Sequence, residues 1–387
     1  MWIYSVGALI AFTFINIYVF KIHNSFKDII FYNMVFFTSI FIGFSILGLI
    51  MSIFSKNIKN MYYVAYFLFI LSFICLFIFN GNLIGAYVFG SLYGLGNGSF
   101  RNAVHTQELK NIMNKNRDFY SSSISVGTNI LSILTPLIIA FIFYICNKIN
   151  FDGYTIIFLI LPLLYSVSFL FINDIDSYIP NKITKVDFKN FFNFKKYKYG
   201  HLYFLIGGLI YSLEIILLPI ISIILLKNEI NIGLFQGILT IISTYLIIHL
   251  SHKRKEETRL KYFFIICVLQ FVNFIFIGTF FNLISFIIFS LVSLFLNPIY
   301  RVSEHVYDLT LMDSIKTKNN DFYPAMLMRE FVLWIGSMSG LTTLLILINF
   351  TKFDTEKFLK IGLIYNGFSF IFLMFCIYLW EKYEKNI

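Results

Sequence analysis

Long apolar stretches follow one another along almost the whole of this 387-residue chain. A helix that crosses the hydrocarbon core of a bilayer needs about 20 predominantly apolar residues. Twelve stretches meet this requirement, and we predict that each is a transmembrane helix. The predicted spans cover residues 2–20, 29–54, 61–79, 82–105, 120–146, 153–172, 201–226, 232–250, 262–280, 283–306, 323–349 and 357–380.

Composition agrees with a membrane protein and excludes other classes. Only 13% of the residues are charged and 58% are hydrophobic, whereas charged residues make up about 25% of an ordinary soluble domain. The same figures exclude a disordered chain, collagen and a coiled coil. The lipid bilayer is therefore the expected partner of most of the surface.

Basic residues are distributed unevenly between the two sets of connections that alternate along the predicted spans. One set, together with the C-terminus, holds 20 Lys and Arg, whereas the other set holds 7 when Lys357 and Lys360 at the start of the last predicted span are counted with it. Connections rich in Lys and Arg stay in the cytoplasm, so both termini are predicted to be cytoplasmic, in a multi-pass protein of the inner (cytoplasmic) membrane. The net charge of +10 then reports membrane orientation, and no nucleic-acid partner is expected.

The chain repeats part of its own sequence across a long basic connection. Residues 101–109 read RNAVHTQEL and residues 301–309 read RVSEHVYDL, and both follow the pattern R-x-x-x-H-x-x-[DE]-L. The repeat extends further, because the letters D-F-Y open the fifth span at Asp118 and the eleventh at Asp321. Such a repeat predicts two related halves. These are a six-helix bundle over residues 1–172, a cytoplasmic linker over 173–200 and a six-helix bundle over 201–387.

The repeated segments carry ionisable residues at helical spacing. Positions i, i+4 and i+7 lie on one face of a helix. A charged residue at the middle of a bilayer costs about 2.5–3.5 kcal/mol on insertion scales, so such a face is expected to meet protein or water. The two polar stripes are Arg101, His105 and Glu108 in the fourth span, and Arg301, His305 and Asp308 in the tenth.

Glycines and prolines also stand inside the predicted spans. A face of small residues lets two helices approach closely, and we expect packing, not phosphate binding, because no Lys-Ser/Thr follows the glycines. Prolines within spans can kink a helix. The glycines of the fourth span are Gly81, Gly85, Gly90, Gly94, Gly96 and Gly98, and the prolines are Pro136, Pro162, Pro219 and Pro298.

Several short segments carry a resemblance to a known family. In chain order they are NSFKDIIFYN (Asn24–Asn33), the glycine-rich fourth span, GYTIIFL (Gly153–Leu159), IGLF (Ile232–Phe235), NPIYR (Asn297–Arg301) and MRE (Met328–Glu330). With these segments, the chain resembles the major facilitator superfamily over nearly its whole length, and within it a poorly characterised bacterial branch of transporter-like proteins. The resemblance implies twelve helices in two pseudo-symmetric bundles around a central cavity. Spans one, four, seven and ten would line this cavity, which opens alternately to either side.

One motif of the superfamily is largely missing. The pattern G-x-x-x-D-x-x-G-R-[RK], between spans two and three, aligns with Gly48–Asn57 (GLIMSIFSKN). Ser52 replaces the acid, Ser55 the glycine and Lys56 the arginine. In the superfamily this motif helps to close the cytoplasmic gate, so the resemblance implies that other contacts close it here. The basic run His252–Lys255 either supplies such contacts or only sets the topology.

Ionisable residues within spans are candidates for the functional site, and each has two interpretations. Glu214 in the seventh span either binds and releases a proton or pairs with an arginine of span four or ten. Arg101 and Arg301 suit an anionic group of a substrate, or they pair with acids near the cytoplasmic mouth. Glu304 either joins this substrate or proton-coupling set or forms an intrahelical pair with Arg301.

Histidines and a second charged group complete the candidate site. His105 and His305 can relay protons near neutral pH, and the alternative is a neutral, hydrogen-bonded histidine near a helix end. Arg329 and Glu330 are expected to engage different neighbours in a network across spans ten and eleven. The candidates for gating or ion-pair contacts are Glu108, Asp308, Arg329 and Glu330.

We predict a secondary active transporter that moves a small organic solute across the cytoplasmic membrane by alternating access, with proton coupling and export. A lipid or glycolipid flippase of the same fold is the alternative, because the arginines can hold an anionic head group. A membrane-embedded enzyme or a non-transporting receptor is a third interpretation, although no HExxH motif or nucleophile elbow is present. No enzymatic activity, cofactor or metal site is expected, and the protein is expected to be a monomer.

Overall fold

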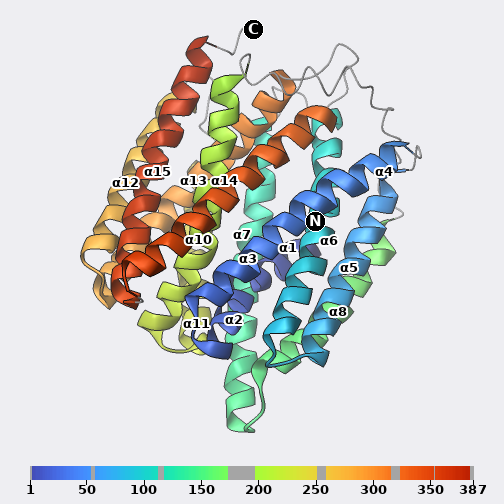
Figure 1. Ribbon diagram of the computed structural model, residues 1–387, viewed down its shortest axis with the longest axis vertical. Coiled ribbons are helices and arrows are strands. Elements are labelled where there is room, and N and C mark those ends of the chain that lie inside the picture. Colours follow the sequence, from blue (N-terminus) through green and yellow to red (C-terminus); the bar gives the residue numbers. More distant parts are fainter. Residues whose placement is uncertain are drawn as a thin grey trace.

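The computed structural model describes residues 2–53, 57–111, 117–172, 197–250, 259–314, 323–352 and 354–383 (Figure 1). Every regular element in these ranges is a helix. The all-α fold class is therefore confirmed. Most of the predicted linker, residues 173–196, and the basic run His252–Lys255 lie outside the described residues.

Each apolar stretch identified in the sequence lies on a helix. The first part of the chain contains α1 (Trp2–Ile10), η1 (Ala11–Ile15), α2 (Asn16–His23), α3 (Phe26–Ile42), η2 (Gly43–Leu47), α4 (Gly48–Ile53), α5 (Lys59–Ile78), α6 (Leu83–Asn111), α7 (Arg117–Lys148) and α8 (Gly153–Ile172). The second contains α10 (Lys198–Leu226), α11 (Glu229–Leu250), α12 (Arg259–Thr279), α13 (Leu283–Ser314), α14 (Tyr323–Phe350) and α15 (Thr355–Tyr383). The π-helical turns η1 and η2 join their α-helical neighbours without a break, so α1 to α2 and α3 to α4 are each one continuous helix.

Ten of the described helical segments are long and apolar enough to cross a membrane. The prediction of twelve spans also included α6 and α11. α6 is less apolar because it carries the first polar stripe, and within α11 the apolar helix counted as a shorter one is Glu229–Ile241. A multi-pass membrane protein is shown, and the two further spans stay predictions.

Two helices extend beyond the apolar stretches that predicted them. α6 continues to Asn111 where the predicted span ended at His105, and α13 continues to Ser314 where the predicted span ended at Val306. Hydropathy marks the apolar part of a helix, whereas the backbone hydrogen bonds continue through polar residues. Both polar stripes consequently lie on regular helix.

Glycines of α6 allow this helix to pack closely against α3. A Cβ atom at Gly94 would lie 2.6 Å from the carbonyl oxygen of Phe36, and one at Gly98 would lie 2.2 Å from that of Ile40. On another side of α6, a Cβ atom at Gly96 would meet the ring of Phe69 in α5 at 2.9 Å. The expected close packing is confirmed, and it holds the polar end of α6 in a fixed position.

Several helix pairs connect the part of the chain before residue 173 with the part after residue 196. α7 packs along α11 and α13, and α3 packs along α14. Within the first part α5 packs on α6 and α8, and within the second α10 packs on α14 and α15. Figure 1 shows α3 and α14 crossing the front of the molecule. The candidate site lies between these two parts.

Candidate functional site

A cavity of about 460 Å³ lies between helices from both parts of the chain. Residues of α1, α3, α6 and α7 line it together with residues of α10, α13 and α14. Its volume falls in the range of about 300–1,000 Å³ that is typical of small-molecule sites. Nine of the ten ionisable residues singled out in the sequence line this cavity, and the tenth, Glu214, contacts one of them. The nine are Arg101, His105, Glu108, Arg301, Glu304, His305, Asp308, Arg329 and Glu330.

Arg301 of α13 holds two carboxylates. Its Nη1 donates to Oε2 of Glu304 at 2.9 Å, and its Nη2 donates to Oε2 of Glu214 at 3.2 Å. The hydroxyl of Tyr300 donates to the other oxygen of Glu304 at 3.1 Å. The intrahelical pair of Arg301 and Glu304 is therefore present, and Glu214 of α10 has the arginine partner that one interpretation gave it.

Arg329 of α14 also holds two carboxylates. Its Nε donates to Oδ2 of Asp308 at 3.1 Å, and its Nη2 contacts the same oxygen. Its Nη1 donates to Oε1 of Glu330 at 2.5 Å. Arg329 and Glu330 engage different neighbours as expected, Asp308 and Arg101 respectively, and their two side chains also bind each other. The expected network across α13 and α14 is present, and Arg101 of α6 extends it with an ion pair to Glu330 at 3.9 Å.

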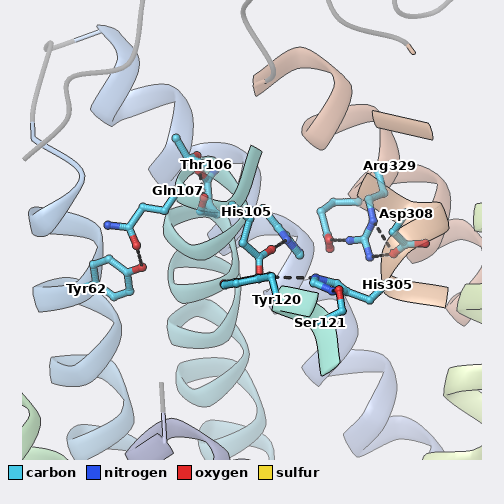
Figure 2. A network of polar contacts seen from close by, with 12 residues as sticks. Tyr62, His105, Thr106, Gln107, Tyr120, Ser121, His305, Asp308 and Arg329 are labelled. Atoms are coloured by element: carbon cyan, nitrogen blue, oxygen red, sulfur yellow. Dashed lines mark hydrogen bonds and ion pairs between the residues drawn. The ribbon is translucent and has the colours of Figure 1, made fainter. Parts of the chain in front are cut away.

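Groups that can lose or gain a proton contact the carboxylate of Glu108. Figure 2 shows three of these groups, His105, Tyr120 and His305, close to one another. This carboxylate is 3% exposed. Nδ1 of His105 lies 2.9 Å from Oε2 of Glu108, and Nε2 of His305 lies 3.5 Å from Oε1. Tyr120 donates its hydroxyl to the same Oε1 at 3.2 Å, and Ser121 Oγ lies 2.7 Å from Nδ1 of His305. The cluster thus joins α6 and α7 to α13, that is, the first part of the chain to the second.

Aromatic side chains form much of the remaining lining, and the sequence did not identify them as site residues. Tyr4 and Phe100 stack with ring centroids 4.0 Å apart, and Phe41 stacks on Trp334 at 5.2 Å. Tyr120, which contacts Glu108 but is not among the lining residues, did carry a signal in the sequence, because it belongs to the repeated D-F-Y segment. The abundance of Phe and Tyr, 49 and 25 residues, hides the few that face the cavity.

A family model of the Major Facilitator Superfamily matches residues 1–304. The chain belongs to this superfamily. Its fold resembles the crystal structure of the human organic anion transporter MFSD10 (TETRAN), with a TM-score of 0.65 and 11% identity over 97% of this chain and 89% of that one. It also resembles a POT family transporter in complex with a thioalcohol-conjugated peptide, with a TM-score of 0.63 and 14% identity over 98% and 95% of the two chains. No curated protein matches the chain in sequence.

The retained glycine of the altered motif in this superfamily member, Gly48, lies at a close contact between helices, whereas the altered positions Ser55 and Lys56 lie outside the described residues. A Cβ atom at Gly48, the retained glycine, would lie 2.3 Å from Nδ2 of Asn102 in α6 and 2.5 Å from the hydroxyl of Tyr323 in α14. The same hydroxyl donates to the carbonyl oxygen of Ser45 in η2 at 2.9 Å. Tyr323 belongs to the second D-F-Y segment, so both tyrosines of the repeat make contacts between helices.

A second set of polar contacts joins the two parts of this superfamily member at the end where α2 and the start of α11 lie, opposite the C-terminus (Figure 1). Nζ of Lys21 lies 2.5 Å from Oε1 of Glu229, and the hydroxyl of Tyr154 donates to the same oxygen at 2.9 Å. Lys21 lies in α2, Tyr154 lies in α8 and Glu229 lies in α11. No motif or spacing relates these residues, so the sequence did not identify them.

Asp152 organises the connection between α7 and α8 at this end. Thr155 Oγ1 donates to its Oδ2 at 2.6 Å, and Asn80 Nδ2 donates to the same atom at 3.1 Å. Burial alone would raise the pKa of this carboxyl, but these hydrogen bonds, with those from the backbone amides of Tyr154 and Thr155, hold the pKa below its usual value. No group of three His, Cys, Asp or Glu side chains among the described residues is arranged to hold a metal ion.

Proposed function

We propose that the protein is a secondary active transporter that moves a small organic solute across the cytoplasmic membrane by alternating access, coupled to protons and in the direction of export. Its superfamily and the transporters that share its fold support membrane transport. The observation that carries the proposal is the cavity of about 460 Å³ at which charged side chains from both parts of the chain meet. Removing charges from water costs free energy, so a cavity lined by them points to solute binding.

The proposed architecture has twelve spans in two six-helix bundles with both termini in the cytoplasm. α6 and α11 complete the ten candidate spans, because each connects two of them in the chain. An even number of spans agrees with the distribution of Lys and Arg between the connections. A fluorescent protein that folds only in the cytoplasm, fused to the C-terminus, is expected to fluoresce. A dark fusion that is present in the membrane would contradict this orientation.

Polar contacts between the two parts lie on both sides of the cavity, which suits alternate opening. Glu108 and His305 meet near the end of α6, and Lys21 and Glu229 meet at the opposite end. Water can replace the partners of such contacts, whereas separating apolar surfaces costs about 25 cal/mol for each Å² exposed. We therefore assign these two contacts to the gates of the transporter.

Proton coupling is assigned to the Glu108 cluster, with Glu214 as a second candidate. The contacts that the structure gives for Glu108 come from His105, His305 and Tyr120, and none of these groups carries a permanent charge. A proton gained or lost here changes the attraction between α6 and α13. Glu214 instead pairs with Arg301, whose charge is permanent. Glu108 is for this reason the better candidate for the coupling residue.

The test is transport by the purified protein in proteoliposomes under an imposed proton gradient, with a panel of small organic solutes. We expect a solute that accumulates only while the gradient lasts, and accumulation in the direction of export. Glu108→Gln is expected to retain exchange of that solute without response to the gradient. Glu214→Gln should keep the response.

Two comparisons keep the assignment specific. Lys148→Gln is the control, because Lys148 is exposed and lies away from the cavity lining. Wild-type transport that is unchanged when the gradient is collapsed would contradict proton coupling. A gradient response lost in Glu214→Gln and kept in Glu108→Gln would move the coupling site to Glu214.

A further inference from the structure

The three arginines of the cavity differ in how fully their charge is matched. Arg301 and Arg329 each hydrogen-bond to two carboxylates. Among the described side chains, Arg101 has no carboxylate within hydrogen-bond distance, because its ion pair with Glu330 spans 3.9 Å and such bonds need about 2.7–3.2 Å. The other oxygen of Glu330 is already held by Arg329 at 2.5 Å. Arg101 is the cavity guanidinium that can best accept a new anionic partner.

Aromatic rings lie beside this guanidinium. Its central carbon is 5.9 Å from the centre of the Tyr211 ring. Tyr4 and Phe100, which stack on each other, line the cavity together with Arg101. The Arg101 side chain is 29% exposed, so it can be reached from the cavity. Flat or apolar groups pack well on such rings, while an anion attached to them meets the guanidinium.

Charge in the same network limits the anion to a single negative charge. Arg101, Arg329, Asp308 and Glu330 contain two cations and two carboxylates. One bound carboxylate gives this group a net charge of −1, and a dianion would give −2. Each further negative charge on the ligand costs more free energy to remove from water, and it is repelled more strongly by the carboxylates of Asp308 and Glu330. A monoanion is the ligand that this network suits best.

We propose that the transported solute is an organic monocarboxylate with an apolar or aromatic body. Its carboxylate binds Arg101, where the guanidinium can present two parallel N–H donors, and its body lies against Tyr4, Phe100 and Tyr211. Arg301 takes no part in this recognition because Glu214 and Glu304 occupy it. The proposal rests on the transporter function proposed above and names the substrate class.

Binding to the purified full-length protein tests this substrate class. The readout is the ligand-dependent rise in the unfolding temperature, with phenylacetate and 4-phenylbutyrate as probes. Their amides have nearly the same shape without the charge, and phenethylamine carries the opposite charge. We expect the carboxylates to stabilise the wild-type protein and the amides and the amine to have no effect. This comparison needs no variant, so it stands even if a substitution prevents folding.

Variants then locate the carboxylate. Arg101→Gln is expected to weaken carboxylate binding about 10- to 100-fold, because hydrogen bonds to a charged group are lost. Arg101→Lys should retain part of the affinity, since the charge stays but the paired donors do not. Lys148→Gln, which removes an exposed positive charge, should bind like the wild type.

Three results would overturn the proposal: equal binding of carboxylates and amides, no binding of either carboxylate, or undiminished binding to a folded Arg101→Gln protein. Transport of a neutral solute in proteoliposomes would contradict the proposed anionic substrate class but would still support the transporter function. Carboxylates that bind through Arg101 but are never transported would contradict the transporter function and leave Arg101 as a carboxylate-binding residue.

Discussion

Most of the acidic side chains at the cavity are paired with an arginine. Glu214, Glu304, Asp308 and Glu330 each lie beside an arginine, and among the described acids of the site Glu108 alone has only titratable partners. Buried carboxylates without a partner are costly. The arginines therefore keep the empty cavity stable, and removing one of them should be felt in folding as well as in transport.

Arg329→Gln is expected to destabilise the protein by about 3–5 kcal/mol, because Asp308 loses its arginine and Glu330 keeps only the 3.9 Å ion pair with Arg101. Equilibrium unfolding in detergent measures this loss. Arg101→Gln is the matched control, since the ion pair of Arg101 with a carboxylate spans 3.9 Å. Equal destabilisation by the two substitutions would contradict this account of the network.

Asp152 gives the protein a pH-dependent contribution to stability. Its folded pKa is depressed, so the stabilisation is present above the unfolded value of about 3.9 and is lost as the pH falls through the folded pKa. Asp152→Asn should lower the unfolding temperature at pH 7 and remove the part of the acid sensitivity that begins near pH 4. Unfolding curves from pH 7 to pH 3 measure both effects. If the unfolding temperatures of wild type and variant differ by the same amount at every pH, the assignment is contradicted.

The sequence could predict residues of the site where a repeat or a helical spacing related them. The repeat identified Arg101 and Arg301, and the i, i+3 spacing identified the pair of Arg301 and Glu304. Lys21 and Glu229 are far apart in the chain and belong to different halves, so only the packed structure brings them together. Tyr4 was missed as well, because nothing in the sequence distinguishes it from the many other aromatic residues.

At the scale of elements, α6 shows how small residues position charged ones. Gly94 and Gly98 bring its backbone against α3, and Arg101 follows directly after this contact. Any side chain at these glycines would move the helix that carries Arg101, His105 and Glu108. The packing face therefore controls the geometry of the cavity.

Gly98→Ala is expected to destabilise the protein by about 1–3 kcal/mol through overpacking, because its Cβ would lie 2.2 Å from the carbonyl oxygen of Ile40. Gly207→Ala on α10 is the control, since its Cβ would meet nothing closer than 3.8 Å and alanine favours helix over glycine. Unfolding of both variants in detergent is the measurement. A loss of stability in Gly207→Ala as large as in Gly98→Ala would contradict the packing argument.

Elements could be located from hydropathy, but their ends and irregular turns could not. Apolar runs found every helix, while the polar ends of α6 and α13 extend into residues that an apolar pattern does not include. The π-helical turns η1 and η2 left no visible signal, because one additional residue in a turn changes no composition.

For the molecule as a whole, contacts at two ends hold the halves in one arrangement. Lys21 joins α2 to α11 through Glu229, and Tyr154 ties α8 to the same carboxylate. Breaking these contacts should favour opening of the cavity at that end, while the Glu108 cluster still joins α6 and α7 to α13 near the other end. In the transport cycle proposed above, the balance between the two sets of contacts is expected to decide which side of the cavity is open.

Glu229→Gln is expected to increase access to the cavity from outside the cell several-fold, because the amide removes the charge that attracts Lys21. A cysteine at Ile124, which lines the cavity, reports access through its rate of reaction with a thiol reagent that does not cross membranes. The native cysteines are replaced beforehand. Glu356→Gln serves as the control, since its pair with Lys360 lies within α15. Labelling at the wild-type rate would contradict the gate assignment.

The π-helical turn η2 has a consequence for the register of the helix beyond it. Residues in an α-helix are separated by about 100° around the axis, and a π-helical turn holds one residue more than an α-helical turn. Deleting one residue from Gly43–Leu47 would therefore restore a regular α-helical turn and leave α4 in nearly the same orientation relative to α3. If the turn became α-helical without a deletion, α4 would instead rotate by about 100°. Gly48 would then face away from Asn102 and Tyr323. The additional residue in η2 thus sets the direction in which Gly48 meets its neighbours, and losing the π-helical turn without losing a residue would misalign this contact.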